Sequence, residues 1–249
     1  MGLMRFLRTS SANKQDPLFQ AVKKITGFSP TDLSLYKRVF THASMEMTDS
    51  QGKKINYERL EFLGDSVLNT IVATHLFKSL PQKNEGSLTL MRSKIVRRDF
   101  LNKIGEQLGL VDYFSSNVPA KNYSQNVHGN LFEALVGAIY LDLGFERCSQ
   151  FVFNKMILPF VDLEKLEFMV LSYKSLLVDW FQKKHTKYAF DVTLDNGAEF
   201  ANHYKARLII DGKTVSKARA KSKKRAVEKA SKRAYYKFQG GIKSIQYKH

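Results

Sequence analysis

The sequence predicts an all-α domain followed by a small α+β domain whose elements run in the order α-β-β-β-α. Apolar residues recur at helical spacing almost throughout residues 20–160, without sustained alternation of apolar and polar positions. Beyond that region three segments do alternate, and the pair Asp211-Gly212 between the last two is a strong signal for a β-hairpin turn. The change of periodicity therefore indicates two domains of different class.

The domain boundaries follow from where these patterns begin and end. Residues 1–20 are polar and patternless, which predicts a loose lead-in, and the helical pattern then occupies residues 21–162. Residues 163–171 form a linker, expected to be at least partly ordered because it lacks the Gly, Ser and Pro of flexible linkers. The small domain is assigned to residues 172–240, with a tail at residues 241–249.

Within the small domain each element can be placed. Residues 172–185 are predicted to form an amphipathic helix whose apolar face includes Trp180 and Phe181. The alternating strands are predicted over residues 188–195, 203–211 and 213–220. A helix over residues 222–238, with alanines repeated along one side, completes the domain.

The composition is strongly basic, with 40 Lys and Arg residues against 23 Asp and Glu residues and a formal net charge of +17. A field of that sign points to polyanions or anionic membrane surfaces as partners. The longest apolar run near the middle of the chain, LFEALVGAIYL, is about half the length of a membrane span and contains Glu133. The N-terminal apolar part is too short for a secretory signal, and the single cysteine, Cys148, suits a reducing compartment. We therefore expect a cytoplasmic protein with no membrane partner.

One predicted helix concentrates acidic residues, in the segment YERLEFLGDSVL at residues 57–68. At about 100° per residue, Glu58, Glu61 and Asp65 fall within roughly 60° of one another, opposite the aliphatic residues of the helix. Such a stripe is usually a solvated helix face. Like charges four residues apart destabilise a helix slightly, however, so a plain solvent face has a small cost.

A second predicted helix, HGNLFEALVGAIYLD, places Glu133 in a nearly continuous apolar run, with Asn130 one turn earlier on the same face. A glutamate is seldom buried without a partner. Two helices that each offer oxygen atoms at this spacing would make a site for a hard cation such as Mg²⁺, although an ordinary surface stripe explains the same spacing. Phe62, on the acidic side of the first helix, is either covered by another segment or subunit or simply exposed.

The segment at residues 57–68 closely resembles the signature helix of the bacterial-type ribonuclease III family. The likeness extends through NEGSLTLMRSKIVRRDFL, GNLFEALVGAIYLD and the C-terminal domain, over roughly residues 20–240. It implies a dimeric, all-helical endonuclease domain followed by a double-stranded-RNA-binding domain. It also implies Mg²⁺-dependent hydrolysis of duplex RNA, with Mn²⁺ as a substitute, leaving 5′-phosphate and 3′-hydroxyl ends with short 3′ overhangs. Relatives process ribosomal RNA precursors and structured messenger RNA.

The resemblance also assigns roles to single residues. Glu61, Asp65 and Glu133 match the direct metal ligands, and Asn130 stands at a further ligand position. Glu58 and Glu85 match the supporting acidic positions of the catalytic set. Phe62 matches the aromatic side chain that inserts into the partner subunit.

At Asn130 the sequence departs from the family, which usually has an aspartate there. An amide keeps an oxygen able to bind Mg²⁺ but loses a full negative charge, so we expect weaker metal binding and a higher Mg²⁺ requirement. The alternative is a noncatalytic double-stranded-RNA-binding protein on the same fold, in which cleavage is weakened or lost.

The C-terminal domain concentrates positive charge: thirteen Lys and Arg residues lie between residues 205 and 237, against two acidic residues. Ser222 is a predicted N-cap, which puts Lys223 and Lys224 in the first helical turn. Cations there oppose the helix dipole unless an anion binds, so the pattern predicts a phosphate site. By resemblance the RNA-binding residues are Lys221, Ser222, Lys223, Lys224 and Gln182.

Two other contact regions match the family less well. In the first helix of this domain, Val178 and Asp179 stand where relatives more often have Gln and Glu. The loop NGAEF at residues 196–200 stands where relatives carry Gly-Pro-x-His. Contacts to the minor groove from these two elements are therefore expected to be reduced, while Gln182 is still able to donate.

Overall fold

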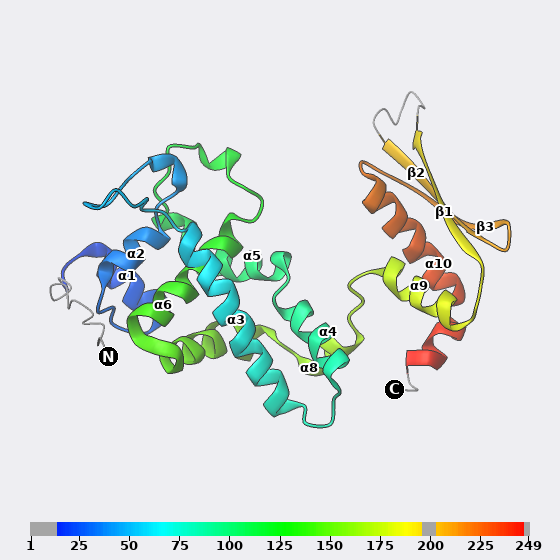
Figure 1. Cartoon of the computed structure of the whole chain (residues 1–249), viewed down its shortest axis with the longest axis horizontal. Coiled ribbons are helices and arrows are strands. Elements are labelled where there is room, and N and C mark those ends of the chain that lie inside the picture. The colour runs from blue at the N-terminus through cyan, green and yellow to red at the C-terminus, as the bar shows by residue number, and fades with distance from the viewer. Residues whose placement is uncertain (1–13, 196–202, 247–249) are drawn as a thin grey trace. The chain divides into compact units, whose positions relative to one another are not determined.

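The computed structural model describes residues 14–195 and 203–246, and the chain divides into two compact units, residues 1–167 and 168–249 (Figure 1). The first unit is helical and the second contains the three-stranded sheet, so the predicted fold class is confirmed. Within the described residues, no helix is both long enough and apolar enough to span a membrane.

The first unit is built from helices, with longer connections before α3 and before α6. Its elements are α1 (Pro17–Thr26), α2 (Leu33–Val39), η1 (Ala43–Met45), α3 (Glu58–Ser79), α4 (Glu85–Ile95), α5 (Arg98–Gln107), η2 (Leu110–Tyr113), η3 (Ala120–Asn122), α6 (Val127–Val152), the π-helical η4 (Phe153–Ile157), α7 (Leu158–Phe160) and α8 (Leu163–Phe168). The central element is α6, against which α2, α3 and α5 pack; Figure 1 shows α3 running beside it. A helix that is apolar on all sides is normally buried, and from Leu131 to Ile139 every residue is buried except Glu133.

Two glycines allow α3 and α6 to approach closely. A β-carbon added at Gly64 of α3 would overlap the backbone oxygen of Glu133, and one added at Gly137 of α6 would overlap the backbone oxygen of Leu60. The backbones are therefore in direct contact at the level of the acidic residues. This contact is what brings the acidic face of α3 next to Glu133.

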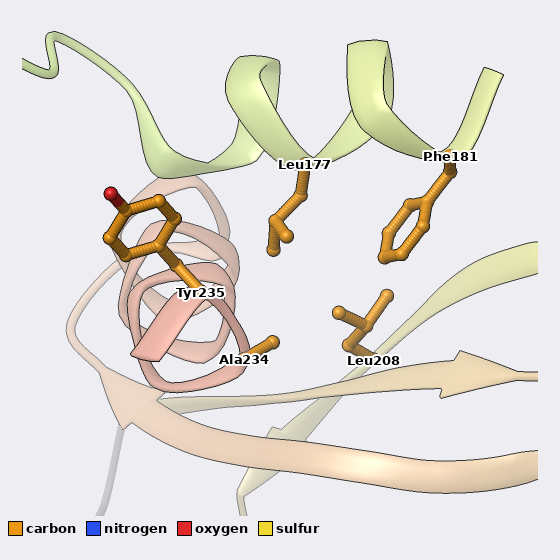
Figure 2. Packing of buried hydrophobic residues seen from close by; sticks show 5 residues of the cluster. All are labelled: Leu177, Phe181, Leu208, Ala234 and Tyr235. Carbon is orange, nitrogen blue, oxygen red and sulfur yellow. The ribbon is translucent and has the colours of Figure 1, made fainter. Parts of the chain in front are cut away.

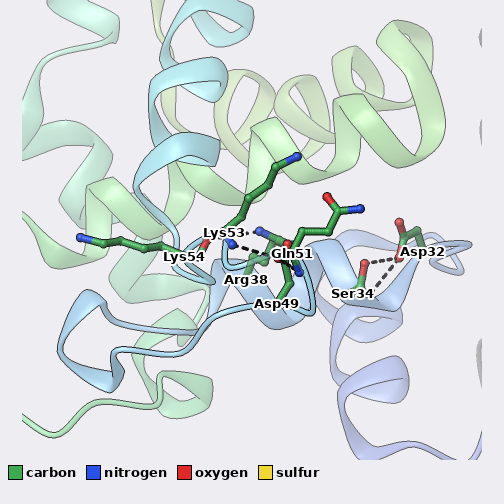
Figure 3. A network of polar contacts seen from close by, with 7 residues as sticks. All are labelled: Asp32, Ser34, Arg38, Asp49, Gln51, Lys53 and Lys54. Carbon is green, nitrogen blue, oxygen red and sulfur yellow. Dashed lines mark hydrogen bonds and ion pairs between the residues drawn. The ribbon is translucent and has the colours of Figure 1, made fainter.

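A polar network fixes the loop that leads into α3 (Figure 3). The Oδ1 atom of Asp49 accepts hydrogen bonds from the backbone N–H groups of Gln51 and Lys53, both at 3.0 Å. Its Oδ2 atom pairs with Arg38 of α2 at 3.1 Å, and Arg38 also donates to the backbone oxygen of Lys54. The network ties the loop to α2 and so sets where α3 begins.

The observed boundaries differ from the predicted ones at three places. Helix α1 begins at Pro17, inside the predicted lead-in, because Asp16 caps it by accepting from the Leu18 N–H at 2.8 Å and proline suits the first helical position. Part of the predicted linker forms α8, and the buried Lys94 donates to the backbone oxygens of Leu166 and Glu167 at its end. The final helix continues to Gln246, into the predicted tail, while residues 1–13 lie outside the described part.

The second unit is an antiparallel sheet with strand order β1-β2-β3 and two helices. Its elements are α9 (Tyr173–Lys183), β1 (Tyr188–Asp195), β2 (His203–Ile210), β3 (Lys213–Ala220) and α10 (Lys223–Gln246). Between β2 and β3, Asp211 and Gly212 both have positive φ, 45° and 76°. Positive φ at both central residues is the conformation required by a tight two-residue hairpin, so the predicted turn is confirmed.

Helix α9, helix α10 and the sheet enclose the core of this unit. Figure 2 shows the side chains of five buried residues directed toward one another: Leu177, Phe181, Leu208, Ala234 and Tyr235. The buried residues of a second cluster are all alanines, and in it Ala226 and Ala230 of α10 pack on strand residues. The predicted apolar face of α9 and the alanine face of α10 therefore both point to the core.

A carboxylate of α10 also contacts the N-terminal end of α9. Glu228 of α10 accepts hydrogen bonds from the Ser172 hydroxyl at 3.0 Å and from the backbone N–H groups of Tyr173 and Lys174. A negative charge at a helix N-terminus is favourable because it meets the positive end of the helix dipole. This contact sets the position of the N-terminal end of α9 against α10.

Candidate active site and RNA-binding surface

A cavity of about 440 Å³ opens between α3, α5 and the first turns of α6. The predicted acidic and amide residues that line it are Glu58, Glu61, Asp65, Asn130 and Glu133. Arg98, Asn102 and Asn126 line it as well. The fold thus brings together two groups of residues that lie about seventy positions apart in the sequence.

The carboxylates in this cavity repel one another. Burial, together with the negative charges of Asp65 and Glu61, raises the pKa of Glu133 to about 7, against the opposing influence of Arg98. Burial also raises the pKa of Glu61, with added contributions from Glu58 and Asp65. In the absence of a cation, the cluster therefore stores unfavourable electrostatic free energy.

We expect Glu133→Gln to stabilise the protein when divalent cations are absent. The Glu133 carboxyl has an ordinary pKa of 4.5 and a pKa of about 7 in the folded chain, so its ionisation opposes folding as the pH rises between these values. The variant lacks this charge and should gain about 1–2 kcal/mol above pH 7, a value discounted for partial solvent exposure. Thermal unfolding in EDTA at pH 4.5, 6 and 8 measures it; equal differences at all three pH values would contradict the expectation.

Two asparagines that sequence reasoning missed hold parts of the cavity in place. The side chain of Asn56 donates to the Glu58 carboxylate at 3.3 Å, and its oxygen accepts from the Glu58 backbone N–H at 3.2 Å. Asn102 of α5 accepts from the Gly129 N–H at 2.8 Å and donates to the Gln125 oxygen at 3.0 Å. Asn56 could have been found from the sequence, because an asparagine just before a helix is a common capping signal. The Asn102 contacts join distant segments and leave no local signal.

Glu85 does not lie at this cavity within one copy of the chain. It is the first residue of α4, accepts from the Thr89 hydroxyl at 3.0 Å and lines a separate hollow with Phe77 and Arg92. Helix α3 continues fourteen residues beyond Asp65 before the chain turns into α4, which at about 1.5 Å per residue is roughly 21 Å. Within a single chain Glu85 therefore lies apart from the other predicted acidic residues, and its supporting role stays a prediction.

The C-terminal unit presents the predicted cluster of lysines. The Ser222 hydroxyl oxygen accepts from the Arg225 N–H at 3.3 Å, so the predicted N-cap of α10 is confirmed. Lys221, Lys223 and Lys224 are exposed, and the Lys223 ammonium lies 5.7 Å from the centre of the Tyr204 ring. An N-terminal helix turn with exposed cations is suited to a phosphate group.

Some basic residues of this unit make contacts within the unit and are not part of the lysine cluster. Arg207 and Arg219 pair with Asp191 and Asp195 across the sheet. From α10, Arg233 and Lys237 donate to backbone oxygens of the edge strand β3. Gln182 is exposed on α9, and the loop at residues 196–200 lies outside the described part of the chain.

These two units define a class of protein in which a helical domain gathers carboxylates around one cavity and a small α+β domain presents exposed lysines. Residues 32–160 match the family model described as Ribonuclease-III-like, and residues 173–237 match the double-stranded RNA binding motif. The chain belongs to the ribonuclease III family. The predictions of the family and of a double-stranded-RNA endonuclease are confirmed.

Similar proteins span nearly the whole chain. Ribonuclease 3 of Zunongwangia profunda is 49% identical over 96% of this chain and 98% of its own length. Ribonuclease 3 of Flavobacterium psychrophilum is 48% identical over 97% of this chain and 99% of its own. Among solved structures, the ribonuclease III nuclease domain of Campylobacter jejuni is 29% identical, with a TM-score of 0.51, and covers 57% of this chain and 98% of that one.

Proposed function

We propose that this protein hydrolyses both strands of duplex RNA in a Mg²⁺-dependent reaction, with Mn²⁺ able to replace Mg²⁺. The products are 5′-phosphate and 3′-hydroxyl ends with short 3′ overhangs, and the substrates are ribosomal RNA precursors and structured messenger RNA in the cytoplasm. The observation that carries this proposal is the convergence of Glu61, Asp65 and Glu133 on one cavity. The exposed lysines at the start of α10 bind the phosphates of paired RNA.

The donor set of the cavity suits a hard divalent cation, because all its candidate ligands are oxygen atoms. In the described ranges no three His, Cys, Asp or Glu side chains are close enough to hold an ion as they stand, so the carboxylates would have to draw together. Burial and their mutual repulsion raise the pKa of Glu133 and Glu61, and a cation would relieve the repulsion. We assign Glu61, Asp65, Asn130 and Glu133 to that role, with Glu58 held nearby by Asn56.

Bound Mg²⁺ would activate water and offset the charge that develops on the leaving oxygen. The protein's own side chains do the rest. The negatively charged carboxylates repel an RNA phosphodiester until a cation balances their charge. Arg98, which is exposed, places a positive charge at the cavity. The second unit reads the A-form shape of the duplex rather than its sequence, which directs the reaction to paired RNA.

The amide at position 130 should set the metal requirement. We expect Asn130→Asp to lower the Mg²⁺ concentration for half-maximal cleavage by about tenfold, because it restores a carboxylate ligand. A Mg²⁺ titration of cleavage on a long duplex measures this. Asn126→Asp is a charge-matched control, since it adds the same charge at the same cavity. An unchanged requirement in Asn130→Asp, or an equal shift in the control, would contradict the assignment.

We also propose that the helical unit forms a homodimer. Phe62 of α3 is 78% exposed, Phe77 is 71% exposed and Leu90 of α4 is 50% exposed. Large apolar side chains exposed on neighbouring elements are typical of an interaction surface. The nuclease domain of Campylobacter jejuni is described as having a region involved in dimer formation. A second copy of this chain is therefore the partner we assign to the face around Phe62.

Phe62→Ala should shift the protein toward monomer. A well-packed aromatic at the centre of an interface contributes about 2 kcal/mol or more, so the dimer dissociation constant should rise by about thirtyfold. Sedimentation velocity over a concentration series measures it. Phe168→Ala is the control, because Phe168 is also largely exposed but lies on α8. Unchanged sedimentation of Phe62→Ala would contradict the proposed interface.

A further inference from the structure

Lys94, on α4, carries a charge that is buried inside the helical unit, where the residue is only 3% exposed. A lysine is almost never fully buried unless its ammonium group has partners. Here the ammonium donates hydrogen bonds to the backbone oxygens of Leu166 at 2.8 Å and Glu167 at 3.1 Å. Lys94 does not line the acidic cavity, so its role lies in the segment that it holds.

The two oxygens that Lys94 binds belong to the last residues of α8. The final carbonyl groups of a helix have no partner inside it, and a cation there meets the negative end of the helix dipole. Leu166 is buried next to this contact, and the Glu167 carboxylate pairs with Lys83 in the turn before α4. A helix of six residues is marginal by itself in water, so α8 depends on these contacts. Lys94 therefore anchors the C-terminal end of α8 to α4.

The anchor determines how much chain joins the helical unit to the second unit. With Glu167 held, only the five residues 168–172 lie between the anchor and the start of α9, and they span at most about 17 Å. With the anchor released and α8 detached, the twelve residues 161–172 between α7 and α9 join the units, and they span up to about 41 Å. The anchor therefore shortens the tether by more than half.

We propose that Lys94 is a positioning residue that keeps this tether short and so raises the effective concentration of the RNA-binding unit at a duplex held by the helical unit. When two linked units bind one ligand, the effective concentration of the second falls with about the −3/2 power of tether length. Lengthening the tether from five to twelve residues should therefore lower it by about fourfold. This inference rests on the proposed function, in which both units bind the same duplex.

The first test measures the anchor itself, by amide hydrogen exchange of full-length Lys94→Met without RNA. Methionine keeps an unbranched side chain of similar length and removes the ammonium group. Exchange over residues 163–167 should become faster by about tenfold, because buried carbonyl groups lose their partner, while α6 keeps its protection. Lys165→Met is the matched control, since this exposed lysine of α8 pairs only locally, with Asp162. Unchanged exchange over residues 163–167, or an equal increase in α6, would overturn the anchor.

The second test measures the tether, by steady-state cleavage of a long duplex. Lys94→Met should raise KM by about fourfold and leave kcat unchanged. A partly unfolded protein would instead show a lower kcat, so the two parameters separate positioning from stability. In the background of Lys223→Ala plus Lys224→Ala, where the second unit binds phosphates weakly, Lys94→Met should raise KM by less than about twofold.

A length-matched variant tests the tether without touching Lys94. An insertion of about seven Gly and Ser residues between Glu167 and Phe168 keeps the anchor and gives the tether its released length, so it should reproduce the rise in KM. An unchanged KM after the insertion, or an equal rise from Lys94→Met in both backgrounds, would overturn the tether role and leave the proposed nuclease function intact. A natural protein that cleaves no duplex RNA with Mg²⁺ or Mn²⁺ would overturn the proposed function, while hydrogen exchange would still test the anchor.

Discussion

Glu133→Gln is expected to reduce cleavage of duplex RNA by at least about 100-fold while leaving affinity for the duplex unchanged. Loss of a group that only supports a metal ligand costs about 10–100-fold, and Glu133 is assigned as a ligand itself. The substitution keeps the size of the side chain, removes its charge and replaces one carboxylate oxygen with an NH₂ group that cannot bind a cation. The same variant is expected to be the more stable protein without divalent cations, because the pKa of Glu133 is raised to about 7.

Two assays on the same duplex separate the two effects. Fluorescence anisotropy in EDTA measures binding, and gel analysis of products after Mg²⁺ addition measures cleavage. Glu106→Gln is the control, an exposed acidic residue of α5 outside the residues that line the cavity. Cleavage by Glu133→Gln within about threefold of the natural protein would contradict its assignment. A parallel loss of binding would show instead that the substitution acts through RNA affinity.

The double substitution of Lys223 and Lys224 with alanine is expected to weaken binding to all duplexes by a similar factor, about tenfold or more. These lysines lie in the first turn of α10 and are exposed. Each phosphate contact that is lost should reduce the slope of log affinity against log salt by about one, so the slope should fall by about two. Shape-based recognition requires the loss to be independent of sequence.

Binding isotherms at several salt concentrations, on at least three unrelated duplexes, test this. The control is the double substitution of Lys23 and Lys24 with alanine, which removes the same charge from exposed positions at the end of α1. A loss confined to one sequence would contradict recognition by shape. An unchanged salt slope would mean that the two lysines do not contact phosphates.

The parts of this protein that could be predicted are those encoded locally. Helical periodicity identifies the face that carries Glu61 and Asp65, and the apolar run around Glu133 identifies the central helix. Turn and cap chemistry identified Asp211-Gly212 and Ser222, because only a few residue types suit those backbone conformations. These signals predicted the fold class and pointed to the carboxylates that line the cavity.

What could not be predicted depends on contacts between distant segments. Asn102 of α5 accepts a hydrogen bond from the Gly129 N–H near the start of α6. Periodicity shows which face of a helix is apolar but not which polar side chain of another element it will meet. For the same reason charge counting could not separate Arg207, which pairs across the sheet, from lysines that remain exposed.

The most direct test of the central claim is anomalous diffraction from crystals of the full-length protein soaked in Mn²⁺. We expect an anomalous peak in the cavity between α3 and α6, within coordination distance of Glu61, Asp65 and Glu133. A cavity without such a peak, in crystals of protein that cleaves duplex RNA in the same Mn²⁺ solution, would contradict the assignment of these residues as the metal-binding centre.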